Sequence, residues 1–310
     1  KGKLTIGKAP LYVHAKDASR EFGVENPVFE ADYSGFRNSE KLEDIGLNTS
    51  PELITEATAA SAVGVYDITA NVTGLLARNY ALLSRVQKGK LTIGKATLTV
   101  AAQDESREYG EENPSFNAVY SGFRNADKLA DAGLSKSPVL NTLADKNSDA
   151  GIYDINVDIT GVESRNYALA VRALSGKLNI GKATLTVSAQ DASREYGLEN
   201  PDFVAVYEGF KNSDDIAKVN VNKAPGLSTS ATAASEVGSY DISADVSGME
   251  SKNYSIVSKA AKGKLTIGKA PLYVHAKDAS REYGVENPVF EADYSGFRNS
   301  EKLEDIGLNT

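Results

Sequence analysis

The chain of 310 residues contains no cysteine, no tryptophan, one methionine and two histidines. The lack of cysteine excludes disulfides, so each folded part must be held together by its own apolar core. It does not place the chain in the cytosol, because disulfides are permitted but not required outside the cell. With no thiol, two histidines and no glycine-rich phosphate-binding loop, the sequence offers little for catalysis. We therefore expect no enzymatic activity and no cofactor.

Positive charge is outweighed by negative charge. The 34 lysines and arginines face 42 acidic residues, which gives a formal net charge of −8, and no basic block occurs. A nucleic-acid partner requires a basic surface, so we expect none. No apolar run approaches the roughly 20 residues of a membrane span, and no signal peptide is visible in this window. We expect no membrane span in these residues.

A repeat with a period of 87 residues runs through the sequence. The segment KLTIGKA or KLNIGKA begins at Lys3, Lys90, Lys177 and Lys264, with no insertion or deletion between copies. A fixed period of this kind marks a tandem array. We predict that residues 1–8 are the last strand of a preceding module. The modules that follow are called module 1 (residues 9–95), module 2 (96–182), module 3 (183–269) and the terminal half-module (270–310).

Two parts of the chain are almost identical. Residues 1–49 match residues 262–310 at every position except Phe22, which is Tyr283 in the second copy. Consecutive modules differ much more, so the larger repeating unit is a set of three dissimilar modules. We expect a window of a longer array, whose terminal half-module is ordered only if more chain or another copy completes it.

Apolar and polar residues alternate with a period of two through most of each module, which is typical of strands with one buried face. In module 1 the first strand should bury Leu11, Val13 and Ala15. Two further alternating segments, residues 27–36 and 64–74, predict two more strands. Their buried faces are formed by Phe29, Ala31 and Tyr33, and by Tyr66, Ile68, Ala70 and Val72. The rest of the module is expected to add shorter strands.

The end of each module carries two further signals. Gln87, Lys88 and Gly89 lie where a hairpin turn would join two strands. The segment KLTIGKATLTV then reads as one strand entering the next module, with only Gly94 and Lys95 between the two strands and no flexible linker. We expect a jointed, semi-rigid rod in which each module adds about 35–45 Å.

One segment of each module breaks the alternation. Residues 37–47 predict a helix of one or two turns with Asn38 or Ser39 as the N-cap and Gly46 as the stop, and the signal is weaker in module 3, which lacks the glycine. Six or seven short strands and one helical turn make a mainly β fold, and they favour an immunoglobulin-like β-sandwich for each module. A β-grasp-like module is the alternative, because the helix lies between the second and third strands.

Several separated motifs recur in order in every complete module: K-A-x-L-x-V, an aromatic residue with G-x-x-N-P-x-F, G-F, G-x-Y-x-I, N-Y and a closing G-K-L-x-I-G-K-A. Together they resemble the MBG domain of the YGX type, a family of tandem extracellular modules in large bacterial surface proteins and adhesins, including those of gliding Bacteroidetes-type bacteria. The resemblance implies a cell-surface or secreted filament without catalysis. Phe22 and Glu208 depart from the usual Tyr and Ser of these motifs.

The same resemblance implies that the motif residues are architectural. In module 2, Tyr109 would serve packing, Gly110 a turn, Asn113 and Pro114 the approach to a strand, and Gly122 the end of that strand. No catalytic, cofactor-binding or metal-binding residue is implied.

The two histidines, His14 and His275, occupy one repeat position and are expected on an exposed strand face. A carbohydrate or protein contact through Tyr12, His14 and Lys16 is the sharper alternative. It would occur once in three modules, because the equivalent positions carry Thr99, Ala101 and Gln103 in module 2 and Thr186, Ser188 and Gln190 in module 3.

Other candidate sites are weaker. Asp154, Asn156 and Asp158 have the spacing of a calcium loop, but they alternate along a strand, so we expect a solvated face instead. Calcium at acidic loops near the module ends stays open, at Glu25, Glu111, Glu112, Asp214 and Asp215. Three Asn-x-Ser/Thr triplets, at Asn48, Asn71 and Asn253, match a glycosylation acceptor and are attributed to chance. Lys–Asn isopeptide pairing is not readable from spacing.

Three functional hypotheses follow. The first is a structural shaft of a long extracellular adhesin or filament that spaces a tip from the cell and bears force. The second is a multivalent array in which each module binds surface glycans, mucin or another cell weakly. The third is assembly with other copies into a fibre. The varied outer face of the first strand favours the shaft, whose partners are the neighbouring modules of the same chain.

Overall fold

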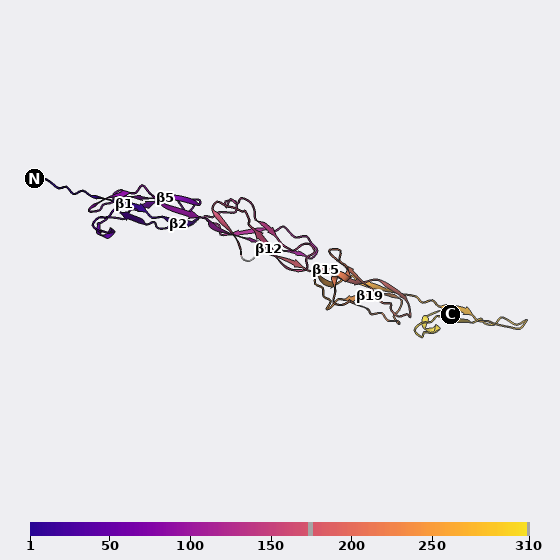
Figure 1. Ribbon diagram of the computed structural model, residues 1–310. Helices are drawn as coiled ribbons and strands as arrows, with labels where there is room; N and C mark the ends of the chain where they lie inside the picture. The colour runs from indigo at the N-terminus through magenta and orange to yellow at the C-terminus, as the bar shows by residue number, and fades with distance from the viewer. Residues whose placement is uncertain (173–175, 309–310) are drawn as a thin grey trace. The chain divides into compact units, whose positions relative to one another are not determined.

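The computed structural model describes residues 1–172 and 176–308, and the regular structure in this part of the chain is mostly β-strand (Figure 1). Module 1 contains β1 (Ala9–Ala15), β2 (Ala18–Glu21), β3 (Ala31–Ser34), β4 (Glu52–Ile54), β5 (Gly64–Asn71), β6 (Tyr80–Ser84) and β7 (Gly89–Gly94). Module 2 contains β8 (Ala96–Ala102), β9 (Glu105–Glu108), β10 (Ala118–Ser121), β11 (Val139–Asn141), β12 (Gly151–Asp158), β13 (Tyr167–Val171) and β14 (Gly176–Gly181). Module 3 contains β15 (Ala183–Ala189), β16 (Ala192–Glu195), β17 (Ala205–Glu208), β18 (Gly226–Thr229), β19 (Gly238–Asp245), β20 (Tyr254–Ser258) and β21 (Gly263–Gly268).

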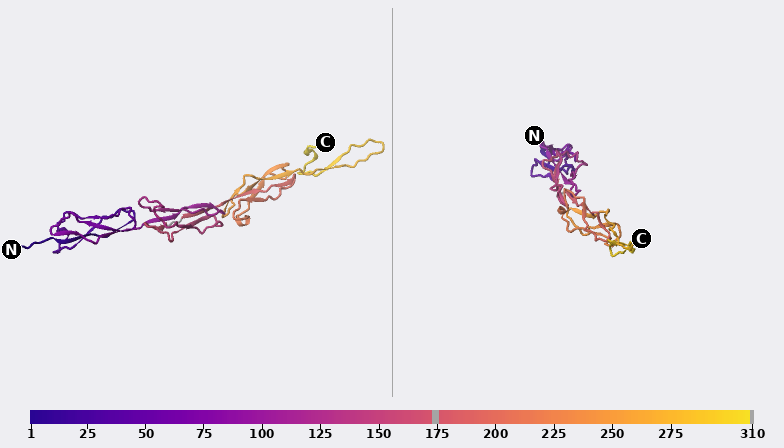
Figure 2. Two further views of the ribbon diagram at one scale, coloured as in Figure 1. Left: turned by 90° about the horizontal axis from the view of Figure 1, so that it is seen from above. Right: turned by 90° about the vertical axis from the view of Figure 1, so that its right-hand side faces the viewer.

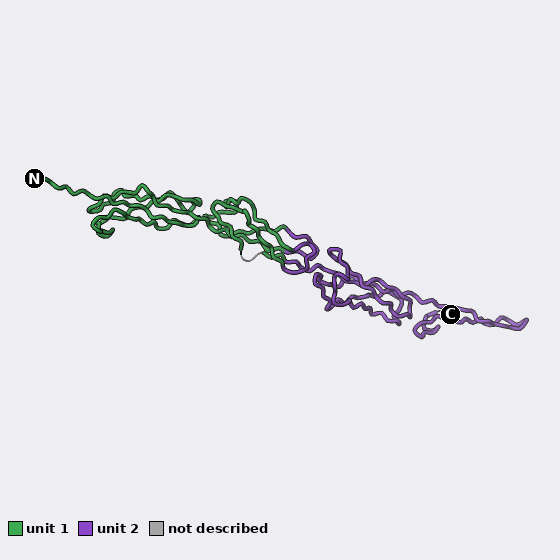
Figure 3. Tube along the Cα trace, in the orientation of Figure 1, with its two compact units in different colours: residues 1–105, 115–143, 153–178 green, residues 106–114, 144–152, 179–310 purple. Residues whose placement is uncertain are grey.

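The chain divides into two compact units (Figure 3). Unit 1 comprises residues 1–105, 115–143 and 153–178, and it contains the whole of module 1. Unit 2 comprises residues 106–114, 144–152 and 179–310, and it contains module 3 and the terminal half-module. The residues of module 2 are shared between the two units. In the part of the chain that is described, no helix is long and apolar enough to cross a membrane.

Within unit 1, module 1 is a sandwich of two sheets with the strand orders β3-β1-β6 and β2-β7-β5-β4. Leu11 and Val13 are fully buried on the inner face of β1, as the alternation predicts. Ala15 of that sheet packs in one apolar cluster with Ile68 and Leu91 of the other sheet. Because two sheets enclose the core, the immunoglobulin-like sandwich is confirmed and the β-grasp alternative is wrong.

Within unit 2, module 3 repeats this arrangement with the strand orders β17-β15-β20 and β16-β21-β19-β18. Its core contains Ile242, Leu265 and Ile267, all at most 1% exposed. The sheets of module 2 have the same orders, β10-β8-β13 and β11-β12-β14-β9. In Figures 1 and 2 the chain enters module 1 at one end and leaves it through β7 at the opposite end. The same is true of module 3, from β15 to β21.

The predicted hairpin at residues 87–89 is wrong. β6 and β7 belong to different sheets, so the chain crosses from one sheet to the other between them. Before it crosses, the Arg85 amide still donates to the carbonyl oxygen of Val13 at 2.9 Å. Gly89 then passes close to β1, where an added Cβ atom would lie 2.5 Å from the carbonyl oxygen of Ala15. The glycine is therefore required by a close backbone approach and not by a turn.

The predicted helix is a single 3-10 turn in module 1, and its N-cap is elsewhere. In module 2 the equivalent residues, 124–134, form turns and no helix, so the prediction of one helix in each module is wrong there. Module 1 has a 3-10 turn, η1 (Leu42–Asp44), that begins after Lys41. Asn38 and Ser39 have positive φ angles of 53° and 58°, so they form the preceding turn. Gly46 does lie in the left-handed region that ends such a segment, with φ 61°.

Module 3 has the most regular helix at this position, contrary to the expected weakness there. The segment is α1 (Ile216–Val219), and the Asp215 side chain caps it by accepting from the Lys218 amide. Asn220 adopts φ 49°, the left-handed conformation that the missing glycine would have supplied. Asparagine tolerates this region better than other non-glycine residues, so the stop signal is kept.

The terminal half-module contains β22 (Tyr273–Ala276), β23 (Ala292–Ser295) and the 3-10 segment η2 (Leu303–Ile306). Val274, the equivalent of the fully buried Val13, is 57% exposed. In module 1 the inner face of β1 is covered by β5 and by neighbouring strands that have no counterpart among residues 270–308. The closed core of the complete modules is therefore lacking in this segment.

Candidate functional site: the joints between modules

The three complete modules are connected by single residues, which is one residue shorter than the predicted junction of Gly94 and Lys95. Lys95 alone separates β7 from β8 in unit 1, and Lys182 alone separates β14 from β15. The linker lysine is itself fixed to the following module: the Lys95 ammonium donates to the carbonyl oxygen of Ser164 at 2.8 Å. Lys182 makes the equivalent bond to Ser251 at 2.7 Å. The joint is a strand that continues from one module into the next.

An aromatic ring of each module packs against the following module. We call these residues the joint rings: Phe22, Tyr109 and Tyr196. Phe22 is 3% exposed and meets Tyr167 of module 2 edge-on, with ring centroids 5.5 Å apart. Tyr109 meets Tyr254 of module 3 at the same distance. The sequence predicts packing for Tyr109, but the partner lies in another module, which a motif within one module does not reveal.

Each receiving ring belongs to the N-Y motif; we call Tyr167 and Tyr254 the socket tyrosines. The Tyr167 hydroxyl accepts from the Arg124 amide at 2.9 Å and donates to Asp127 at 2.6 Å. The Tyr254 hydroxyl is held in the same way by Lys211 and Asp214, at 2.8 Å each. These bonds fix the loop that follows the G-F motif beneath the joint ring.

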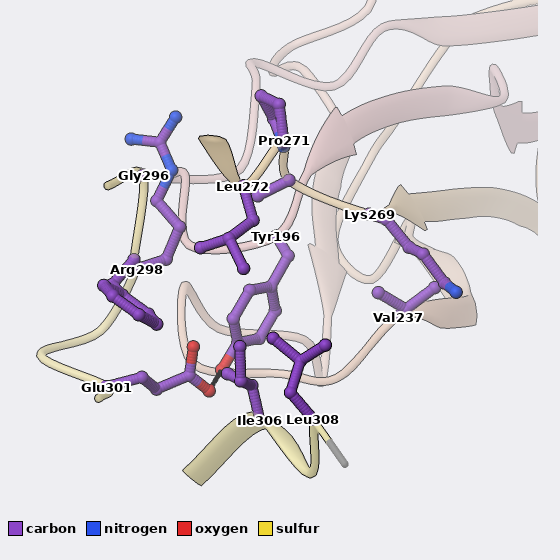
Figure 4. Close-up of a pocket in the computed structure, with 12 residues that line it drawn as sticks. Tyr196, Val237, Lys269, Pro271, Leu272, Gly296, Arg298, Glu301, Ile306 and Leu308 are labelled. Atoms are coloured by element: carbon purple, nitrogen blue, oxygen red, sulfur yellow. Dashed lines mark hydrogen bonds between the residues drawn. The ribbon is translucent and has the colours of Figure 1, made fainter. Parts of the chain in front are cut away.

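The third joint, within unit 2, has a related geometry. Tyr196 projects toward Ile306 and Leu308, which line a hollow of about 470 Å³ (Figure 4). Its hydroxyl donates to the carboxylate of Glu301 at 2.7 Å. Glu301 occupies the repeat position of Asp214, so a carboxylate at this position receives the joint hydroxyl again.

An arginine clamp supports the loop that carries the joint ring. In module 2, Arg107 donates from Nε to the Asn113 side-chain oxygen at 2.8 Å, and the Asn113 amide donates to the carbonyl oxygen of Ala144 at 2.7 Å. The arginine is 8% exposed. The motifs assign Asn113 to the approach of the chain to a strand, but they do not single out Arg107. The missed signal is an Arg-x5-Asn spacing that recurs in every copy.

The joints and their motifs coincide with a known family. The family model for the MBG domain (YGX type) matches residues 11–92, 98–178 and 185–266. The chain belongs to this family. Its three MBG domains are tandem copies, and each supplies the joint ring from the YGX motif or its Phe variant.

Among solved structures, the MBG chain is similar to the I9-I11 tandem from titin at 15% identity. The similarity covers 80% of this chain and 100% of that one, at a TM-score of 0.21, which is too low to compare the two folds. No curated protein sequence matches the chain.

The Tyr-His-Lys face of the first MBG domain lies on the outer side of β1. His14 Nε2 is 3.4 Å from a carboxylate oxygen of Asp32, and Lys16 pairs with Glu30 at 2.9 Å. Tyr12 is 40% exposed beside them. His14 and Lys16 thus face carboxylates across β1 and β3 or the residues next to them, while Nδ1 of His14 is buried without a hydrogen-bond partner among the described residues. His275 occupies the same position on β22.

The calcium-like triplet does not converge on a point. Asp154 pairs with Lys177, and Asp158 accepts from the Thr160 amide at 2.8 Å. The Thr160 side chain, followed by this amide, holds the pKa of Asp158 below its usual value. Asn156 lies opposite Asn141 of β11. Across residues 1–172 and 176–308, no group of three or more His, Cys, Asp or Glu side chains could hold a metal ion.

Four of the five acidic residues near the module ends have protein partners. Glu112 pairs with Lys146 at 3.5 Å, and the Glu111 carboxylate accepts from the Glu108 amide at 3.0 Å. Asp214 and Asp215 accept the Tyr254 hydroxyl and the Lys218 amide, as described above.

All three sequon asparagines use their amides within the fold, and that of Asn71 donates to a Glu52 carboxylate oxygen at 3.5 Å. Asn48 donates to the carbonyl oxygen of Gly74 at 3.3 Å and accepts from the Leu76 amide at 2.7 Å. Asn253 lies in the joint between modules 2 and 3, where it donates to Asp149 at 2.8 Å. Asn71 is exposed at the end of β5. A glycan on Asn48 or Asn253 would displace these bonds.

The ionisation of Tyr254 predicts a loss of stability in alkali. Burial, followed by the nearby Asp214 carboxylate, raises the pKa of this phenol to about 12, while the Lys211 amide acts in the opposite direction. An unfolded tyrosine ionises near pH 10. The stabilisation is therefore fully present below about pH 10 and is lost as pH rises through about 12.

This pH dependence can be measured by denaturing the chain and a Tyr254→Phe variant in guanidinium chloride at pH 9 and at pH 12. The difference in unfolding free energy between the two proteins should shrink at the higher pH. An equal difference at both values would contradict the assignment.

Proposed function

We propose that the MBG modules form the shaft of a long extracellular surface protein or adhesin, which spaces a tip from the cell and bears force. In this proposal residues 9–95, 96–182 and 183–269 act as successive mechanical units. Membership of a family typical of surface proteins supports the extracellular location.

The pairing of the terminal strands carries the proposal. In module 3 the first strand, β15, runs parallel to β20, from Ala183 opposite Tyr254 to Val187 opposite Ser258. The last strand, β21, runs parallel to β16. The chain enters at the start of β15 and leaves at the end of β21, so tension slides each strand along its partner. Several backbone hydrogen bonds are then loaded together instead of one after another.

Module 1 has the same pairing within unit 1. There β1 runs parallel to β6, and β7 runs parallel to β2. The one-residue linkers transmit tension directly from the last strand of one module to the first strand of the next. A load-bearing shaft needs both properties: shear loading within the unit and little slack between units.

Single-molecule force spectroscopy tests this proposal on the full chain. Pulling from the two ends should give three unfolding events, each lengthening the chain by about 250–300 Å, because every module releases 87 residues. The control attaches the handles through cysteines introduced at Glu52 and Asn71, which face each other across β4 and β5, so that the strands are peeled apart. The unfolding force should be clearly lower in that geometry. Gradual extension without discrete events, or equal forces in both geometries, would refute the shaft.

A further inference from the structure

The joint between modules 1 and 2 and the joint between modules 2 and 3 share a frame of polar contacts. The Val63 amide donates to the Asn166 side chain at 3.1 Å, and the Ala150 amide donates to Asn253 at 2.9 Å. A second asparagine spans each joint as well. The Asn125 side-chain amide donates a hydrogen bond to the carbonyl oxygen of Ala59, and the Asn212 amide donates to that of Lys146. Each pair occupies equivalent repeat positions, so this frame does not distinguish the joints.

The joint between modules 2 and 3 makes additional contacts. The Tyr109 hydroxyl donates to the Asp214 carboxylate at 3.1 Å, and that carboxylate also accepts from Tyr254. On the other side of the joint, Asp149 accepts from the Asn253 amide at 2.8 Å and pairs with Lys252. These bonds connect side chains of module 2 to side chains of module 3.

Module 1 has no chemical means of making these contacts. Phe22 stands at the position of Tyr109 and has no hydroxyl, while Ala62 stands at the position of Asp149 and has no carboxylate. The carboxylate that would accept a hydroxyl at position 22 is nevertheless present in module 2. It is Asp127, which already binds the Tyr167 hydroxyl. The ion pair between Arg124 and Glu21 spans this joint at 3.6 Å, but both side chains are about half exposed. Solvent screens such a pair, so it contributes little.

We propose that the end of module 2 formed by Tyr109 and Asp149 is a docking surface fitted to module 3, which makes this joint stiffer than the joint between modules 1 and 2. The chain then contains both firmly docked and more compliant joints, and the difference resides in single side chains. This inference concerns the joints alone and holds whether or not the chain serves as a shaft.

The absence of native cysteine allows each joint to be measured in the full chain. Thr92, Asn179 and Thr266 are equivalent exposed positions on β7, β14 and β21. Spin labels on Thr92→Cys and Asn179→Cys span the first joint, and labels on Asn179→Cys and Thr266→Cys span the second. We expect a narrower distance distribution across the second joint.

Substitutions then assign the difference to the named side chains. Tyr109→Phe and Asp149→Ala together should broaden the distance distribution across the second joint until it matches the distribution across the first joint. Each hydrogen bond lost should shift the ratio of docked to undocked conformers by about fivefold. Phe22→Tyr should narrow the first distribution, because its hydroxyl would face Asp127. This variant adds a group to a sequence that carries tyrosine in its own second copy, at Tyr283, so it should not prevent folding.

The matched control is Asp154→Ala, which removes an aspartate–lysine pair inside module 2, with Lys177, and leaves both joints intact. It should leave both distributions unchanged. Equal widths across the two joints of the unmodified chain would overturn the proposal. So would a second joint that keeps its width after Tyr109→Phe and Asp149→Ala.

Discussion

Replacing Tyr167 with alanine is expected to lower the free energy of unfolding of module 2 by about 3–5 kcal/mol. The ring is 1% exposed and packs against Phe123 of its own module, with centroids 6.3 Å apart, and against the joint ring Phe22. Truncation leaves a cavity on both sides. It also removes the hydroxyl that binds the Arg124 amide and the Asp127 carboxylate, so both partly buried groups lose this partner.

Tyr167→Phe separates these contributions. The ring stays and only the hydroxyl is lost, so a smaller loss of about 1–2 kcal/mol is expected. Chemical denaturation followed by hydrogen exchange of the amides in β8 and β13 would measure both variants. Protection should also fall around Phe22, since its ring packs on Tyr167. An alanine variant as stable as the phenylalanine variant would show that the ring contributes nothing to the joint.

Replacing Gly209 with alanine is expected to destabilise module 3 by about 3 kcal/mol, to which the backbone conformation contributes roughly 1–3 kcal/mol. Gly209 ends β17 with φ +104°, a region that side chains disfavour. An added Cβ atom would also lie 2.5 Å from the carbonyl oxygen of Thr184, which is backbone and cannot rotate away. The close contact adds to the conformational cost.

Gly238→Ala in the same module is the matched control. Gly238 begins β19 without a positive φ, and an added Cβ atom would meet nothing closer than a Tyr240 ring carbon at 3.8 Å. Alanine there should leave stability unchanged or raise it by about 0.4–1 kcal/mol, because it restricts the unfolded chain. Thermal unfolding of the two variants beside the unmodified chain gives the comparison. Equal effects at the two positions would contradict the role assigned to Gly209.

Much of the local structure could be predicted from the residues. The inner face of β1, with Leu11 and Val13, follows from alternation because the side chains of a strand point to opposite sides in turn. The short joint at Lys95 follows from two strand patterns that nearly touch. The short helical segment is less well predicted. In module 3 it depends on Asn220, whose left-handed conformation composition alone does not reveal.

The candidate site was predicted only in part. The motif residues Tyr109, Gly110 and Asn113 were singled out, but their partners were not, because Tyr254, Lys211 and Ala144 lie in another module or in a distant loop of the same one. The importance of Arg107 appears only when its side chain is seen to bind Asn113 and two carbonyl oxygens.

Periodic patterns in the chain are sufficient to establish repeated β modules, the face of each strand that is buried and the absence of any slack linker, because these properties depend on neighbouring residues. The assignment of β6 and β7 to different sheets, and the packing of Phe22 on Tyr167, depend on segments brought together by folding. Such contacts are chosen by the shape and polarity of surfaces that exist only after each sandwich has closed. For this reason the stiffness of a joint is a property of two folded modules and not of the residue that connects them.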